Sequence, residues 1–148
     1  MRSELFLPTA EGEVRLLLLI HAFSGSSKGL EGRTKLAKLD FFVRYPMYFE
    51  RAVAIRDKAP VEPQAQAPTD IETRMGRFRY GPWDPAYFAL IGRLVGRGLI
   101  TTVPVRTGTA YRTTEAGARL AQEVGSTTAW GDVAERVKVC LLYTSPSP

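Results

Sequence analysis

The sequence predicts a mainly α-helical fold that carries one small β-hairpin, which places it in the α+β class. Apolar residues recur at helical spacing in four segments of the chain. Two short β-prone runs flank a Gly-containing turn between the third and fourth of these segments. The chain has 148 residues, of which 45% are hydrophobic, and this is enough for one domain with a core of its own.

The first two helices are expected at about residues 11–22 and 33–44. Five consecutive apolar residues, Leu16 to Ile20, cover all sides of the first helix, so it should lie at the centre of the fold. Pro46 should stop or kink the second helix. The second helix has one apolar face and a second apolar strip, which either packs against the following segment or marks a partner surface. The face contains Leu36, Leu39, Phe42 and Val43, and the strip contains Ala37, Phe41 and Tyr45.

The third helix should run from Asp84, a good N-cap residue followed by Pro85, to about Arg97, with Gly98 as its C-terminal cap. Its buried face is expected to contain Phe88, Ile91, Leu94 and Val95. The hairpin follows, with strands at 99–105 and 110–114 and with Arg106–Thr109 at its tip. Pro104 lacks a backbone donor and belongs at an edge. Thr114 should cap a fourth helix at 115–124.

The order of these elements is helix, helix, helix, two-stranded hairpin, helix, which is typical of a winged helix. Residues 1–126 would form this domain, with an insertion at about 46–83 between the second and third helices. Within the insertion, 47–56 is a candidate short helix. Residues 59–69 contain three prolines and should form a flexible linker. Residues 127–139 would begin a truncated C-terminal region.

The last nine residues, Cys140–Pro148, have the sequence CLLYTSPSP, which resembles a translated transposase sequencing adapter. We therefore expect a non-native tail on a metagenomic fragment, and we expect it to pack poorly. On this interpretation Cys140 is not native, so residues 1–139 contain no cysteine for a disulfide or a metal site.

Three segments carry a resemblance to known proteins: Gly32–Phe42 (GRTKLAKLDFF), Arg79–Trp83 (RYGPW) with Gly98–Ile100 (GLI), and Tyr111–Gly117 (YRTTEAG). They resemble prokaryotic winged-helix proteins with the pattern GRTKLxKLxFL … YGP … GLI … YxxTxxG. Similar proteins include transcription regulators, Panacea-type antitoxins and middle components of ABC-type three-component defence systems. The resemblance covers most of residues 11–125 and implies no catalytic residues. A helix-turn-helix joins its helices through 3–4 residues, whereas about 40 separate them here.

Charge is the strongest functional signal. Residues 73–114 contain seven arginines and one acid, Asp84, which gives +6 within a chain whose net charge is +5. In a winged helix, arginines of the third helix and of the hairpin can contact phosphates or base edges. The candidate nucleic-acid-binding residues are Ala89, Arg93, Arg97, Arg106 and Arg112, with possible secondary contacts from Arg33, Lys35 and Lys38. The alternative is an arginine surface that faces only solvent, and Asp40 and Arg44 are spaced for an ordinary surface ion pair.

No catalytic, metal or cofactor site is expected. His21 is the only histidine and has no cysteine or second histidine as a metal partner, which favours a structural role. No carboxylate pair has a spacing that indicates acid–base catalysis. The apolar run Leu16–Ile20 is too short for a membrane span and follows acidic residues, unlike a signal peptide, so we expect a cytoplasmic protein.

The sequence thus favours a DNA-binding winged-helix transcription regulator that binds double-stranded DNA, as a possible homodimer, through the 89–93–97 helix face. The alternative is a protein-interaction winged-helix subunit of a toxin–antitoxin or anti-phage defence complex. A DNA-binding protein must leave the third helix and the hairpin bare, whereas an interaction module can cover them.

Overall fold

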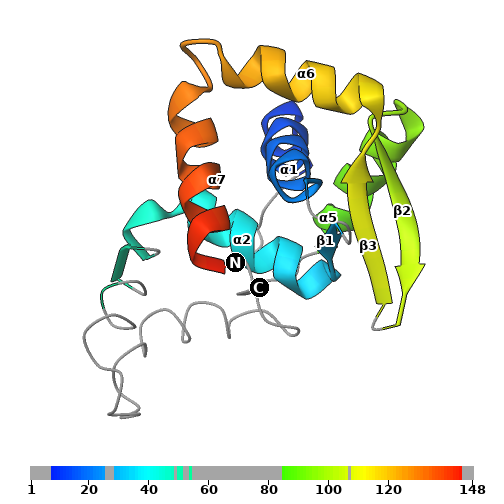
Figure 1. The fold of residues 1–148 in the computed structure, drawn as a ribbon, viewed down its shortest axis with the longest axis horizontal. Helices are drawn as coiled ribbons and strands as arrows, with labels where there is room; N and C mark the ends of the chain where they lie inside the picture. The colour runs from blue at the N-terminus through cyan, green and yellow to red at the C-terminus, as the bar shows by residue number, and fades with distance from the viewer. Residues whose placement is uncertain are drawn as a thin grey trace.

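The computed structural model describes residues 8–25, 29–48, 50–51, 54, 85–106 and 108–144. Its elements are α1 (Ala10–Phe23), β1 (Leu30–Glu31), α2 (Arg33–Arg44), α5 (Ala86–Gly96), β2 (Ile100–Val105), β3 (Gly108–Thr113), α6 (Glu115–Gly125) and α7 (Gly131–Thr144) (Figure 1). The described fold is mainly helical with a small three-stranded antiparallel sheet, so the predicted α+β class is confirmed.

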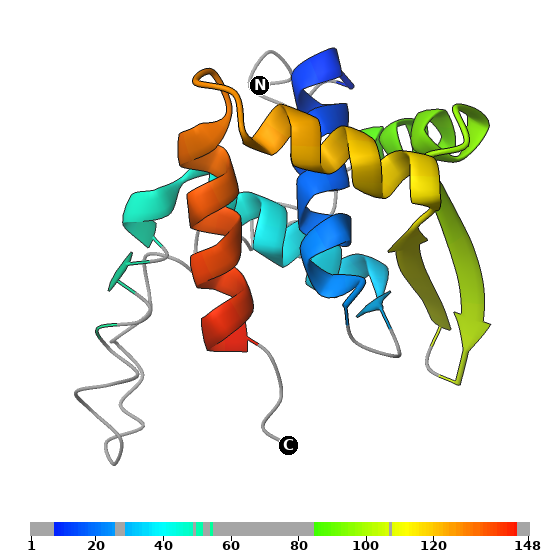
Figure 2. The same ribbon diagram turned by 45° about the horizontal axis from the view of Figure 1, so that its top comes forward.

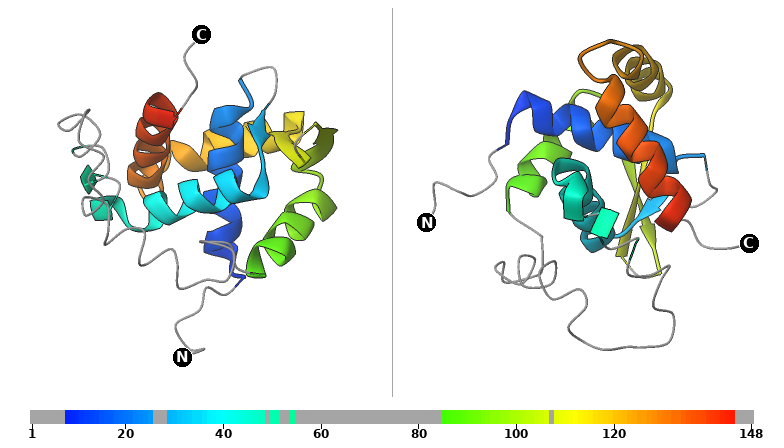
Figure 3. Two further views of the ribbon diagram at one scale, coloured as in Figure 1. Left: turned by 90° about the horizontal axis from the view of Figure 1, so that it is seen from below. Right: turned by 90° about the vertical axis from the view of Figure 1, so that its left-hand side faces the viewer.

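Helix α1 lies at the centre of the molecule, as its apolar run predicts. All five residues from Leu16 to Ile20 are buried, together with Phe23. Helices α5 and α7 lie on opposite sides of α1, and α6 crosses over it (Figures 2 and 3). A helix that is apolar all round can be accommodated only in such a position, because each of its sides meets another element.

Side-chain caps and glycines set the helix boundaries. The Thr114 hydroxyl accepts a hydrogen bond from the Gly117 amide at 3.0 Å, so the predicted cap of α6 is confirmed. The Thr9 hydroxyl caps α1 in the same way, on the Gly12 amide at 3.1 Å. Gly98 has φ +76° directly after α5, as expected for the residue that ends this helix.

Helix α2 has the predicted bounds. It follows Gly32, which has φ +99°, and the chain leaves the helical conformation at Tyr45. Helical residues resume at Pro46, so this proline marks the break between two helical segments.

The sheet has the strand order β1-β3-β2, and all its pairs are antiparallel. The predicted hairpin is present, and Pro104 lies on the edge strand β2, as expected. The predicted tip at 106–109 is wrong for Gly108 and Thr109, which pair with Val105 and Pro104 as the first residues of β3. Strand β1, which lies between the first two predicted helices, was not predicted from the sequence, and its residues Leu30 and Glu31 pair with Tyr111 and Ala110 of β3. Gly29 precedes this strand with φ +72°, and a Cβ there would come within 2.7 Å of the Tyr111 carbonyl oxygen.

The predicted buried face of α5 is partly wrong. Tyr87, Leu90 and Leu94 are the buried residues of this helix, whereas the side chains of Phe88 and Val95 are 53% and 43% exposed. Positions 87, 90 and 94 follow helical spacing and point at α1, so α5 is rotated relative to the prediction. Tyr87 can be buried because its hydroxyl has a hydrogen-bond partner, described below.

Helix α7 extends into the tail that was expected to pack poorly, and that expectation is wrong for its first residue. Cys140 is 1% exposed and belongs to the core, and Leu141 packs against the core. The following residue, Leu142, is 77% exposed. The Arg136 guanidinium donates to the Val43 carbonyl at 3.1 Å and ties α7 to the end of α2. The adapter origin of the tail stays a prediction.

Several predictions concern residues outside the described ranges: most of the insertion at 46–83, the linker at 59–69, the N-cap role of Asp84 and the resemblance segment Arg79–Trp83. Among the described residues, no helix is long and apolar enough to cross a membrane.

The motif that ends the family resemblance, Tyr111-x-x-Thr114-x-x-Gly117, is structural. Tyr111 is 2% exposed in the core, and the Thr114 hydroxyl donates to the Gly98 carbonyl at 2.7 Å. A Cβ on Gly117 would overlap the Leu99 carbonyl oxygen. These residues fix α6 on the sheet, so they carry information about the fold and not about a binding site.

Candidate interaction surface on helix α5

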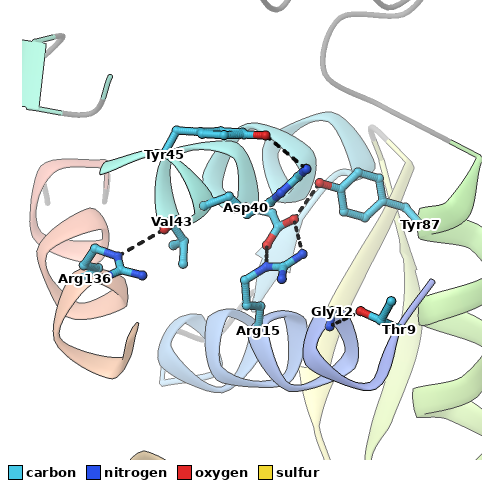
Figure 4. A network of polar contacts seen from close by, with 9 residues as sticks. Thr9, Gly12, Arg15, Asp40, Val43, Tyr45, Tyr87 and Arg136 are labelled. Atoms are coloured by element: carbon cyan, nitrogen blue, oxygen red, sulfur yellow. Dashed lines mark hydrogen bonds and ion pairs between the residues drawn. The ribbon is translucent and has the colours of Figure 1, made fainter. Parts of the chain in front are cut away.

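A buried polar network holds α5 in place (Figure 4). Asp40 of α2 is 0% exposed and accepts hydrogen bonds from Arg15 Nε at 2.8 Å and from the Tyr87 hydroxyl at 2.7 Å. The three residues come from α1, α2 and α5. Burial, together with the neighbouring Asp40 charge, raises the pKa of Tyr87 well above its ordinary value of 10.0, so the hydroxyl stays protonated and donates.

The interpretation of Asp40 as part of a solvated ion pair with Arg44 is therefore wrong for Asp40, which lies in the core. A buried carboxylate needs paired donors, and Arg15 and Tyr87 supply them. The i,i+4 spacing of Asp40 and Arg44 indicated a surface pair because spacing within one helix carries no information about partners on other helices.

The two arginines predicted for DNA recognition contact the start of α1. Arg97 Nε lies 2.9 Å from Glu13 Oε1, and Arg93 Nη1 lies 3.5 Å from Glu13 Oε2. Arg93 Nη1 also donates to the Pro8 carbonyl at 3.1 Å. Glu13 is 8% exposed, whereas the side chains of Arg93 and Arg97 are 45% and 61% exposed. One buried carboxylate thus binds both guanidinium groups at the edge of α5.

The outward face of α5 is apolar and partly flat. Phe88 and Val95 stand out from it, and between them the glycines leave open space. The exposed residues on this face are Phe88, Ala89, Gly92, Val95 and Gly96, and we call them the α5 face. Ala89, a predicted DNA contact, is thus exposed, and its polar neighbour one turn along the helix is Arg93, which is bound to Glu13.

The structure splits the other predicted arginines. Arg106 is exposed at the hairpin tip, as predicted. Arg112 Nη2 donates to the Ser24 carbonyl at 3.0 Å, at the C-terminal end of α1. Ser24 is 11 positions from Glu13, or about 16 Å along a helix. Arg112 is therefore held at the opposite end of α1 from Arg93 and Arg97, and the predicted set does not form one cluster.

The secondary candidates on α2 also differ among themselves. Arg33 is exposed and places its guanidinium carbon 5.2 Å from the centre of the Phe88 ring, which brings α2 to the rim of the α5 face. Lys35 is half-buried, with Nζ 5.0 Å from the centre of the Phe23 ring. Lys38 is exposed.

The described residues contain no group of three potential metal ligands from His, Cys, Asp and Glu. His21 is half-buried near the end of α1, and its Nδ1 is buried without a hydrogen-bond partner.

Sequence reasoning missed Glu13 as the partner of both arginines. One sequence signal could have found it. Glu13 lies three residues before Leu16 and four before Leu17, so it shares a helix face with these two buried leucines, and a carboxylate on such a face needs a cationic partner. No family model matches the chain, and no curated protein or solved structure matches it.

Proposed function

We propose that the chain is a winged-helix domain with an insertion between α2 and α5, and that it serves as a protein-interaction subunit. The fold part of this proposal is supported by the order α1-β1-α2-α5-β2-β3 and by the pairing of β1 with β3. In the proposed winged helix, the β2–β3 hairpin is the wing, and α5 occupies the position of the recognition helix, which enters the major groove in DNA-binding members of this fold.

The α5 face carries the functional part of the proposal. A helix that reads the major groove presents hydrogen-bonding side chains to base edges and phosphates. Here the residues of the α5 face are apolar or lack a side chain, and Phe88 and Val95 are 53% and 43% exposed. The exposed arginines at its edge, Arg93 and Arg97, are bound to Glu13. Exposed apolar patches favour contact with another protein. The glycines would let a partner backbone approach the helix closely.

The state of Arg93 and Arg97 points the same way. A DNA phosphate would compete with Glu13, which contacts both guanidinium groups at 3.5 and 2.9 Å. The resemblance to antitoxins and to defence-system middle components suggests a partner: another subunit of a toxin–antitoxin or anti-phage complex, with an apolar contact surface.

The test compares binding by two variants at apolar positions of similar exposure. Val95→Glu places a charge on the α5 face, and Leu120→Glu does the same on α6, where the side chain is 37% exposed. Each variant is co-expressed with the products of the adjacent genes, and the complexes are sized by sedimentation. We expect Val95→Glu to abolish a complex that wild type and Leu120→Glu form. Equal complexes from all three proteins, or none from wild type, would refute the proposal. Sedimentation of wild type alone tests the possible homodimer.

A second candidate is the DNA-binding regulator, which the exposed Arg106 at the hairpin tip favours. Binding would then depend steeply on salt, because each neutralised phosphate releases counterions. Arg106→Ala should flatten the salt dependence by about one unit of slope. Arg93→Ala and Arg97→Ala should relax sequence preference by about 1–3 kcal/mol per lost base contact. A salt titration of these variants against a DNA library distinguishes the candidates, since the interaction proposal expects no binding even at low salt.

A further inference from the structure

A cleft of about 900 Å³ is lined by residues of the C-terminal half of α1, of α6 and of α7. The arrangement of these three helices can be followed in Figure 2. This volume lies in the range of small-molecule sites. Helix α7 lies on the opposite side of α1 from α5, so the cleft is separate from the α5 face (Figure 3). Its wall is apolar and includes Leu18, Ala22, Ala118, Ala121, Val137 and Leu141.

Four ionisable side chains also line this cleft: His21, Arg112, Glu115 and Lys138. Arg112 is fixed by its bond to the Ser24 carbonyl at 3.0 Å. Lys138 Nζ lies 3.6 Å from Glu135, in a pair whose side chains are 69% and 71% exposed. Such an exposed pair is weak, so Lys138 is available to an anion.

His21 is the group that the fold leaves unsatisfied. Its Nδ1 is buried without a hydrogen-bond partner, although buried polar atoms are normally paired. A neutral imidazole offers one donor and one acceptor, and protonation adds a second donor. Among the residues that the structure describes, His21 is thus a lining residue of the cleft whose buried Nδ1 lacks a partner.

We propose that this cleft binds a small amphipathic carboxylate. The hydrocarbon part lies against the apolar wall, and the carboxylate interacts with the cations of the lining, Arg112 and Lys138. Two cations against the single carboxylate of Glu115 give the lining a net positive charge, which selects an anionic head group. The proposal goes beyond the interaction function and does not depend on it.

The first test measures binding of decanoate, decanol and decyltrimethylammonium to the full chain by calorimetry, below their micellar concentrations. We expect decanoate to bind at least about tenfold more tightly than the cationic analogue and more tightly than decanol. Octanoate should bind about tenfold more weakly than decanoate, because two buried methylenes are lost. Equal affinities for the three head groups, or no binding of decanoate at millimolar concentration, would overturn the proposal.

The second test locates the site with matched variants. Ala118→Trp fills the cleft and should reduce decanoate affinity at least about tenfold, whereas Ala116→Trp, on the exposed face of the same helix, should not. Lys138→Met should weaken binding about two- to fivefold, whereas Lys38→Met, at an exposed lysine that does not line the cleft, should not. Thermal melts check folding. If Ala118→Trp does not fold, the Lys138 and Lys38 variants decide, and equal binding by these two overturns the assignment.

Discussion

The Tyr87 hydroxyl provides a direct test of how α5 is held. Its bond to Asp40 Oδ2 is 2.7 Å long, and both side chains are buried. A hydrogen bond to a charged group contributes about 1.5–3 kcal/mol, so Tyr87→Phe should lower the free energy of unfolding by that amount. The matched control is Tyr45→Phe. That side chain is 41% exposed, and its hydroxyl accepts from Arg44 only at 3.5 Å, so we expect a loss below about 0.5 kcal/mol.

Urea denaturation of both variants at neutral pH measures the difference. A Tyr87→Phe loss as small as that of Tyr45→Phe would contradict the network. Asp40→Ala should cost more, about 3–5 kcal/mol, because it leaves Arg15 and the Tyr87 hydroxyl without their partner.

The same network predicts a dependence on alkaline pH. Burial holds the pKa of Tyr87 in the folded state above its unfolded value of about 10. Above pH 10 the unfolded state loses the proton first, so the contribution of Tyr87 to stability falls by up to about 1.4 kcal/mol per pH unit. Below pH 10 it is fully present. The stability advantage of wild type over Tyr87→Phe should therefore shrink between pH 10 and 11, and an advantage that stays constant would contradict the buried phenol.

Three further predictions follow from packing. Gly117→Ala should destabilise the protein by about 2–3 kcal/mol, because its Cβ overlaps the Leu99 carbonyl. In contrast, the Cβ of Gly92→Ala meets nothing within 4 Å, so this variant should stabilise α5 by about 0.5–1 kcal/mol. Urea denaturation measures both. Truncation after Val139 should lower the unfolding free energy by about 1–2 kcal/mol, since it removes the buried Cys140; an unchanged value would show that the tail adds nothing. Burial raises the pKa of Cys140 to about 11, so a disulfide reagent should modify it much more slowly at pH 8 than in urea, and equal rates would show that the end of α7 opens.

Local patterns in the sequence were enough to predict most of the element boundaries. The cap at Thr114, the positive φ of Gly98 and the bounds of α2 depend on a few neighbouring residues, and each prediction is confirmed. Strand β1 was missed because two residues have no periodicity to detect. Its existence depends on β3, which lies about 80 positions along the chain.

The rotation of α5 was a harder problem for sequence reasoning. Phe88 and Val95 are more hydrophobic than Tyr87, so a pattern of hydrophobicity alone turns them inward. The structure instead buries Tyr87, because Asp40 on another helix accepts a hydrogen bond from its hydroxyl. Buried polar partners that come from distant segments cannot be recognised from spacing, and the same is true of Glu13 with its two arginines.

The arginine excess, which made DNA binding the first interpretation, acquires a different meaning once these partners are known. Of the arginines of this basic stretch that the structure describes, Arg93 and Arg97 bind a buried carboxylate and Arg112 binds a backbone carbonyl. Arg93 and Arg97 thus join the end of α5 to the start of α1, and Arg112 joins strand β3 to the end of α1. These three arginines therefore contribute to assembly around the central helix. The side chains of Arg93 and Arg97 are also 45% and 61% exposed at the edge of the α5 face, and Arg106 is exposed at the hairpin tip. Because Glu13 already binds the guanidinium groups of Arg93 and Arg97, the apolar α5 face beside them favours a protein partner over a phosphate backbone.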